Sequence, residues 1–257
     1  MAQLAQLALL LGLCFLGSFM GLIGGIALLW REKFARKMSF FFISFAAGAL
    51  LGAAFFDLLP EAIELAQPVE FVWIAVLASI ILFSVTERLL VWHHHHENHY
   101  KEHPKSKKPY GPLVIAGDTI HNFIDGVVIA AALLISMPLG IITALAVFFH
   151  EIPQEVGDFS VLLHAGYSRM QVIGYNILSA AATFVGALGV FFFASSLQTK
   201  LPFLLAFAAG GFIYIAAADL LPELKHEASK LPQVIVQTAL MILGMVVMII
   251  LSAYFGV

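Results

Sequence analysis

The amino-acid sequence predicts an all-α integral membrane protein with eight transmembrane helices. Three observations lead to this prediction: 61% of the 257 residues are hydrophobic, only 11% are charged, and the mean hydropathy is +0.96. A soluble domain has about 45–50% apolar and about 25% charged residues, so this chain has too few polar side chains to cover a surface in water. Its long apolar runs lack strict alternation, which favours helices over a transmembrane β-barrel.

Eight apolar segments are long enough to cross a bilayer, because a transmembrane helix needs about 20 mostly apolar residues. Short polar or proline-containing breaks separate them, of which the most basic is the segment 31–38. The first segment lacks the basic n-region of a signal peptide, so we expect it to be retained. We therefore expect a single transmembrane domain over residues 1–257. The predicted spans are residues 4–30, 39–64, 69–92, 113–136, 139–164, 169–196, 201–223 and 232–256.

The basic residues predict how the chain is oriented. If the N-terminus lies outside, twelve of the 13 Lys and Arg residues fall in or beside cytoplasmic loops, and only Lys200 falls outside. Because Lys and Arg are enriched on the cytoplasmic side, we expect both termini outside the cytoplasm, in the plasma or inner membrane. The apolar composition predicts the lipid bilayer as partner. The net charge of −3 says little about partners, and without a large basic patch we expect no nucleic acid binding.

Residues 93–112 are the one long hydrophilic loop that the sequence predicts, and the orientation above makes it cytoplasmic. The loop has no core-forming pattern, so we expect it to be flexible. Its composition favours a metal-capturing segment of low specificity, with a merely solvated linker as the alternative. Its six histidines are His93, His94, His95, His96, His99 and His103.

The chain contains an internal repeat. The segments Phe45–Glu61 and Phe207–Glu223 are offset by 162 residues and agree at ten of seventeen positions, including a shared DLLPE. In the predicted orientation the two copies run in opposite directions, so helices 1–3 and 6–8 would form an inverted repeat around central helices 4 and 5. Such repeats are typical of transporters. Each copy carries an intramembrane acid, Asp57 or Asp219, three residues before a proline that frees a backbone carbonyl. These acids are candidate cation positions on a pathway, with a helix-end cap or a lipid-interface acid as the alternative.

The two central spans break the apolar pattern most sharply. They contain DTIHNFIDG at residues 118–126 and HEIPQEVGD at residues 150–158. Polar residues at this depth are costly and usually functional, and a spacing of four places residues on one helix face. Two antiparallel helices would then offer two imidazoles, two carboxylates and two amides near mid-membrane; the alternative is a polar network without metal. The candidate metal ligands are His121, Asn122, Asp125, His150, Glu151 and Gln154.

This set of ligands suits a borderline divalent cation. Imidazole with carboxylate fits zinc, iron or manganese better than calcium or magnesium, which prefer oxygen alone. The single cysteine, Cys14, lies in an apolar run and is not a candidate ligand. Amide ligands weaken metal binding, which suits a transported ion better than a stored one. The residues therefore predict transport of divalent metal ions, zinc first, with Glu155 and Asp158 as exit acids.

Two other functions are compatible with parts of this pattern. An intramembrane metallopeptidase would carry HExxH on a helix, but Gln154 stands at the second histidine position. A membrane metal sensor without transport would use the histidine-rich loop, but it would leave the inverted repeat unexplained.

At the motifs of residues 121–126 and 150–158 the chain resembles the ZIP (Zrt/Irt-like) family of metal transporters. Eight spans and a histidine-rich loop between spans 3 and 4 agree with this resemblance. It implies uptake of zinc toward the cytoplasm, with cadmium, iron or manganese as further substrates, and a homodimer, since members commonly form dimers. It also implies a central binuclear site, and the positions that match the ligands of the family are His121, Asn122, Asp125, His150 and Glu151.

The chain departs from the family pattern at two positions. Gln154 stands where many members have histidine, and the sixth span lacks Asp and Glu, so that Asn176 is its obvious polar substitute. Glutamine is a poorer ligand for zinc, so the first departure affects the strength and selectivity of the first site. The second departure predicts that a second ion would be weakly held or absent.

Overall fold

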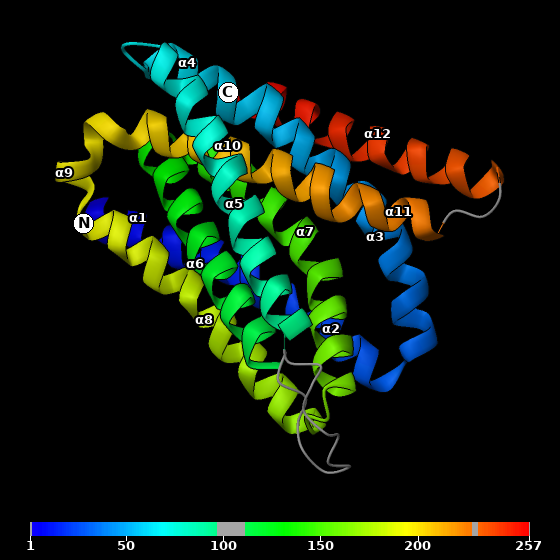
Figure 1. The fold of residues 1–257 in the computed structure, drawn as a ribbon. Helices are drawn as coiled ribbons and strands as arrows, with labels where there is room; N and C mark the ends of the chain where they lie inside the picture. The colour runs from blue at the N-terminus through cyan, green and yellow to red at the C-terminus, as the bar shows by residue number, and fades with distance from the viewer. Residues whose placement is uncertain (1, 97–110, 228–230, 257) are drawn as a thin grey trace.

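The computed structural model describes residues 2–96, 111–227 and 231–256, which form helices joined by short turns (Figure 1). The α-helices are α1 (Ala2–Cys14), α2 (Leu22–Trp30), α3 (Glu32–Gly52), α4 (Leu59–Leu65), α5 (Glu70–His96), α6 (Gly111–Ile135), α7 (Met137–His164), α8 (Arg169–Phe192), α9 (Ala194–Leu197), α10 (Leu201–Tyr214), α11 (Leu221–Glu227) and α12 (Leu231–Phe255). Three π-helical segments, η1 (Phe15–Phe19), η2 (Ala53–Leu58) and η4 (Ile215–Leu220), and the 3₁₀ turn η3 (Gln198–Lys200) join neighbouring helices.

Within the described residues, eight helical stretches are long and apolar enough to cross a membrane. The prediction of an all-α membrane protein with eight spans is confirmed. The spans are Gln3–Trp30, Glu32–Leu65, Glu70–Arg88, Gly111–Ile135, Met137–His164, Arg169–Phe192, Ala194–Leu224 and Leu231–Phe255.

The prediction that the basic segment 31–38 separates the first two spans as a loop is wrong. The chain leaves the helical conformation only at Arg31, with φ −140° and ψ 61°, and α3 begins at the next residue. Lys and Arg are good helix formers, and Glu32 in the first turn interacts favourably with the positive end of the helix. The second helix therefore extends beyond its apolar part, with the side chains of Lys33 and Lys37 exposed.

Both copies of the repeat contain a π-helical segment at the same place. Segments η2 and η4 each cover six residues and are 162 positions apart, the offset of the repeat. Each ends two residues before a proline, Pro60 or Pro222. A proline has no N–H to donate, and its ring clashes with the carbonyl four residues earlier, which here lies inside the π-helical segment. The two copies thus share a local conformation, and their inversion across a membrane stays a prediction.

Equivalent glycines of the two copies lie at helix crossings. A Cβ atom on Gly48 of α3 would come within 1.8 Å of the Met241 carbonyl of α12, and one on Gly210 of α10 within 2.5 Å of the Val76 carbonyl of α5. Small residues allow transmembrane helices to approach this closely. As a result α3 packs along α12, and α10 packs along α5.

Helix α7 is the centre of the bundle. Its membrane window is 67% buried inside the protein, against 17% for each of the windows in α5 and α12. Helix α6 lies beside it and packs most closely against α8, while η1 and α2 cover another side of α7 (Figure 1). The second polar motif is therefore on the most buried span, and the first is on its neighbour α6, whose window is 56% buried.

The histidine-rich loop at 93–112 falls mostly outside the described residues. Helix α5 continues through the backbone of its first four histidines and ends at His96, while residues 97–110 are not described. The metal-capturing role of this loop stays a prediction.

Candidate metal centre

The polar motifs of α6 and α7 meet inside the bundle. His121 lies ten residues after the start of α6, about 15 Å along the helix axis. His121 and Asp125 share one face of α6 because they are four residues apart. His150 and Glu151 lie in the middle of α7 and face them. The depth expected from the sequence therefore agrees with the position of these four residues along their helices.

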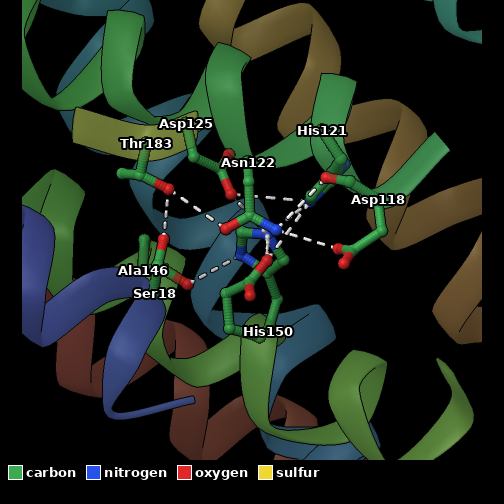
Figure 2. Close-up of polar contacts among 9 residues, drawn as sticks. Ser18, Asp118, His121, Asn122, Asp125, Ala146, His150 and Thr183 are labelled. Atoms are coloured by element: carbon green, nitrogen blue, oxygen red, sulfur yellow. Dashed lines mark hydrogen bonds and ion pairs between the residues drawn. The ribbon is translucent and has the colours of Figure 1, made fainter. Parts of the chain in front are cut away.

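These four residues form a compact cluster of metal-ligating atoms, which we call the histidine cluster. One atom from each of His121, Asp125, His150 and Glu151 lies within 4.8 Å of the other three. The two Nε2 atoms are 3.0 Å apart (Figure 2). Asp125 Oδ2 lies 3.5 Å and 3.6 Å from the Nε2 atoms of His121 and His150, and Glu151 Oε1 lies 3.7 Å and 3.9 Å from them.

The spacing of the histidine cluster suits a tetrahedral zinc ion. With zinc–ligand distances of about 2.0–2.1 Å, the ligand atoms of a tetrahedron are about 3.3 Å apart. Five of the six separations are 3.0–3.9 Å, and all four ligand atoms lie within 4.8 Å of one another. A zinc ion that draws the four side chains inward would thus be bound by two nitrogens and two oxygens.

The histidine cluster also carries buried charge that needs a partner. His150 and Glu151 are fully buried and Asp125 is 2% exposed. Among the described residues, Asp125 Oδ2 and both carboxylate oxygens of Glu151 have no hydrogen-bond partner. A buried carboxylate is costly unless a cation or a proton compensates it. A divalent cation between the four side chains would supply that compensation.

The backbone of α7 orients His150 toward the histidine cluster. Its Nδ1 lies 3.1 Å from the carbonyl oxygen of Ala146, one turn earlier. In the tautomer in which Nδ1 donates to this carbonyl, Nε2 keeps its lone pair and points at the other ligands. Metal-binding histidines usually have such a contact on the second nitrogen, which fixes the ring and its tautomer.

Asn122 lies in a neighbouring hydrogen-bond network rather than in the histidine cluster. Its Nδ2 donates to Asp118 Oδ1 at 2.8 Å, and its Oδ1 accepts from Thr183 Oγ1 at 3.0 Å. Thr183 Oγ1 is in turn 2.5 Å from Ser18 Oγ (Figure 2). This network, Asp118–Asn122–Thr183–Ser18, connects α6 to α8 and to η1. The role of Asn122 as a metal ligand stays a prediction.

Gln154 lies beside the histidine cluster, in a cavity that starts there. The cavity has a volume of about 360 Å³ and is lined by side chains of α5, α6, α7, α10 and η4, including His121 and Gln154. Four carboxylates also line it, those of Glu87, Asp118, Asp158 and Asp219. The structure thus gives the sixth predicted ligand a position at the cavity wall, one turn along α7 from His150.

Three residues that matter for the site were not expected from the sequence. Ser18 is the single Ser or Thr of the first span, and Thr183 is one of several polar residues of the sixth span, so no pattern marks either of them. Asp118 has a clearer signal, because it lies four residues before Asn122 and thus on the same face of α6.

The comparisons with known proteins agree with this geometry. A profile of the ZIP zinc transporter family matches residues 4–112 and 92–252, which together cover nearly the whole chain. The chain belongs to the ZIP family. ZIP proteins are transporters, so the family argues against the alternative of an intramembrane metallopeptidase, as does Gln154 at the second histidine position.

Three curated relatives are named zinc transporters. The zinc transporter ZIP13 of Pongo abelii is 33% identical over 227 residues, which is 82% of this chain and 66% of the relative. The zinc transporter foi of Drosophila melanogaster is 37% identical over 153 residues, or 60% and 22% of the two chains. Human ZIP10 is 36% identical over 199 residues, or 63% and 24%. This chain thus spans between 22% and 66% of the length of these relatives.

Asn176, the polar residue that the sixth span offers in place of an acid, is buried and makes a hydrogen bond within its own helix. Asn176 is 2% exposed, and its Nδ2 donates to the carbonyl of Val172 in its own helix at 2.7 Å. Its amide is therefore engaged locally. The amide oxygen, which is the atom that would bind a metal ion, takes no part in this bond, so the expectation that a second ion is weakly held or absent stays a prediction.

Proposed function

We propose that this ZIP protein carries divalent metal cations, zinc first, across the bilayer and toward the cytoplasm through the histidine cluster. The observation that carries the proposal is the cluster itself, four ligand atoms within 4.8 Å of one another on the two central helices. Its mixture of nitrogen and oxygen ligands favours zinc, and also suits cadmium, iron and manganese. ZIP13, ZIP10 and foi are all named zinc transporters, which supports zinc as the first substrate.

The access route supports movement toward one end of the bundle. The cavity leads from His121 to the end where α5 finishes and α6 begins. In the orientation predicted from Lys and Arg, this end is cytoplasmic. Asp158 lies on this route, as expected for an exit acid.

The opposite side of the histidine cluster is closed by packed apolar side chains. Ile129 of α6 and Val147 of α7 are fully buried, and a Cβ atom on Gly17 would meet each of them at 3.2 Å. A transporter must keep one side of its binding site closed while the other side is open. The packed side chains of Ile129 and Val147 close one side of the histidine cluster and the cavity opens on the other, which fits an inward-open state.

The acids of the two repeat copies differ in a way that fits alternating access. Asp219 is exposed and lines the cavity, whereas Asp57 is 1% exposed and buried. If the copies are inverted, the opposite state would expose Asp57 and bury Asp219. We propose that Asp57 and Asp219 become exposed in turn as the transporter changes state, and that each is a cation position on the pathway.

The proposal is tested by zinc and cadmium flux into proteoliposomes, with His121→Ala and Glu151→Gln as variants. Each removes one ligand of the histidine cluster, so we expect saturable flux in the wild type and its loss in both. His164→Ala is the matched control, because His164 lies on α7 outside the cluster. Wild-type protein that binds zinc but shows no flux under an inward gradient would refute transport and favour a metal sensor.

Cross-linking of the same proteoliposomes would test the expected homodimer. The plasma or inner membrane remains the proposed location.

A further inference from the structure

The four ligands of the histidine cluster differ in how they meet the cavity. Of the four, His121 is the one that lines it. Its side chain is 13% exposed, whereas those of Asp125, His150 and Glu151 are 0–3% exposed. An ion that moves between the cluster and the cavity therefore passes His121, so the support of this ring controls how easily the ion leaves.

The two imidazoles of the cluster are held in different ways. Nδ1 of His150 lies 3.1 Å from the carbonyl oxygen of Ala146, which fixes that ring from its own helix. In the described part of the chain, every polar contact of His121 is made by Nε2, the atom that faces the other ligands. A metal-binding histidine is usually fixed through its second nitrogen. His121 lacks that support, so its ring must be held by packing.

An aromatic ring from a third helix provides this packing. Phe83 of α5 lies with its ring centroid 6.4 Å from that of His121, and the two planes are 88° apart. This is the edge-to-face arrangement that aromatic pairs prefer. Phe83 lines the cavity together with His121, so it covers the side of the imidazole on which the cluster is open.

Phe83 is itself held from behind by α10. Helix α5 packs chiefly along α10 and carries no ligand of the cluster. The Phe83 ring lies 6.0 Å from the ring of Tyr214, and a Cβ atom on Gly211 would come within 3.1 Å of it. The ring therefore has little room to move away from His121.

The second imidazole has a similar aromatic neighbour but does not depend on it. Phe212 of α10 lies 6.0 Å from His150, with the planes 62° apart. Since the Ala146 carbonyl already fixes His150, the ring of Phe212 adds packing without deciding the orientation of the imidazole. The two aromatic contacts should thus have unequal effects on metal binding.

We propose that Phe83 is the positioning residue of His121. Its ring keeps Nε2 of His121 in the histidine cluster; without it, the imidazole turns into the cavity and the bound ion leaves faster. This rests on the proposed function, because it takes the histidine cluster as the metal site. It adds to that function a residue that binds no metal and comes from a helix outside the polar pair.

The test is Zn²⁺ binding to the full-length protein in lipid nanodiscs, with the affinity measured by calorimetry and the dissociation rate by stopped-flow transfer to a chelator. Phe83→Leu stays apolar but removes the ring. We expect it to bind Zn²⁺ about threefold to tenfold more weakly and to release it faster by a similar factor, as the contribution of an aromatic pair predicts. Phe83→Tyr keeps the ring and should restore the wild-type values.

Co²⁺ in place of Zn²⁺ gives a readout that a loss of stability alone would not move. Its visible absorption depends on the ligands around the ion and on their geometry. At saturating Co²⁺, we expect the spectrum of Phe83→Leu to change in the direction of His121→Ala, which removes the imidazole altogether. The spectrum of Phe83→Tyr should match that of the wild type.

Two phenylalanines of α10 serve as matched controls. Phe203 makes a similar contact with Phe71 of α5, at 6.2 Å and 88°, but touches neither histidine of the cluster. Phe203→Leu therefore removes a ring between the same two helices and should leave Zn²⁺ affinity unchanged. Phe212→Leu should also leave it unchanged, because the backbone holds His150. Unfolding temperatures show whether each variant folds, and Phe83→Met replaces Phe83→Leu if that variant does not.

The outcomes separate this role from the proposed function. Wild-type protein that binds no Zn²⁺ would overturn both. If the wild type binds Zn²⁺ and the folded Phe83→Leu protein has the same affinity, release rate and Co²⁺ spectrum, the positioning role alone is overturned. Equal losses in Phe83→Leu and Phe203→Leu, or in Phe83→Leu and Phe83→Tyr, would overturn it as well.

Discussion

Nε2 of His121 lies 3.0 Å from Nε2 of His150, and the two rings are nearly perpendicular, at 84°. This contact joins α6 and α7 at the point where the apolar pattern of both spans is interrupted. Two imidazole nitrogens this close are held either by a shared proton or by a common cation. The unpartnered oxygens of Asp125 and Glu151 beside them favour the cation.

Gln154 makes the affinity of the site adjustable by a single substitution. It lines the cavity beside His121. In Gln154→His an imidazole replaces the amide, and we expect zinc to bind about tenfold more tightly, equivalent to about 1.4 kcal/mol. Flux at saturating zinc should fall, because a tightly held ion leaves slowly. Calorimetry and proteoliposome flux measure the two effects, and Gln154→Asn, which keeps an amide, is the control; equal affinity in both variants would contradict the prediction.

The hydroxyl of Thr183 connects three helices behind the site. It donates to Asn122 and contacts Ser18 of η1. We expect Thr183→Val to lower the free energy of unfolding by about 1–2 kcal/mol, because two buried polar groups lose a partner. Flux should also fall, since Asn122 is no longer held. Thr143→Val is the control: Thr143 is equally buried but donates only to Leu139 in its own helix. An equal loss of unfolding free energy in Thr183→Val and Thr143→Val would contradict a stabilising role of the hydrogen-bond network between the three helices.

Two glycines of α8 should respond differently to the same substitution. A Cβ atom on Gly186 would lie 2.1 Å from the carbonyl oxygen of Phe123 in α6, whereas one on Gly189 would meet nothing within 4 Å. Gly186→Ala must therefore push α6 away from α8. We expect it to destabilise the protein by about 1–3 kcal/mol and to weaken zinc binding, because α6 carries His121. Gly189→Ala should leave the stability and the zinc affinity unchanged. Thermal unfolding and zinc titration of the two variants measure this difference.

Cysteine accessibility can test both the cavity and the orientation. The only native cysteine, Cys14, is fully buried, so the background labelling is low. Thr86 lines the cavity, while Thr143 is 1% exposed on the other side of the histidine cluster. We expect Thr86→Cys to react with a membrane-impermeant maleimide added from the cytoplasmic side, and Thr143→Cys to stay unlabelled from both sides. Labelling of Thr86→Cys from the outside alone would reverse the predicted orientation.

The sequence by itself determines the spans and the type of site. Apolar runs of about 20 residues form helices in a bilayer, because every backbone polar group must find its hydrogen-bond partner within the segment. The cost of polar side chains at mid-membrane marks the motifs of residues 118–126 and 150–158 without any knowledge of packing. The apolar pattern does not determine the helix boundaries: α3 begins at Glu32, inside the basic segment, because helix propensity acts beyond the apolar region.

Only the tertiary structure decided which of the six candidate residues meet. His121, Asp125, His150 and Glu151 converge, whereas Asn122 turns to Asp118 and Thr183, and Gln154 lies on the cavity wall. Helical spacing places residues on a face, but the rotation of α6 against α7 and α8 is set by close crossings such as that of Gly186 with Phe123. These contacts join residues 63 positions apart, and a local sequence pattern carries no information about them.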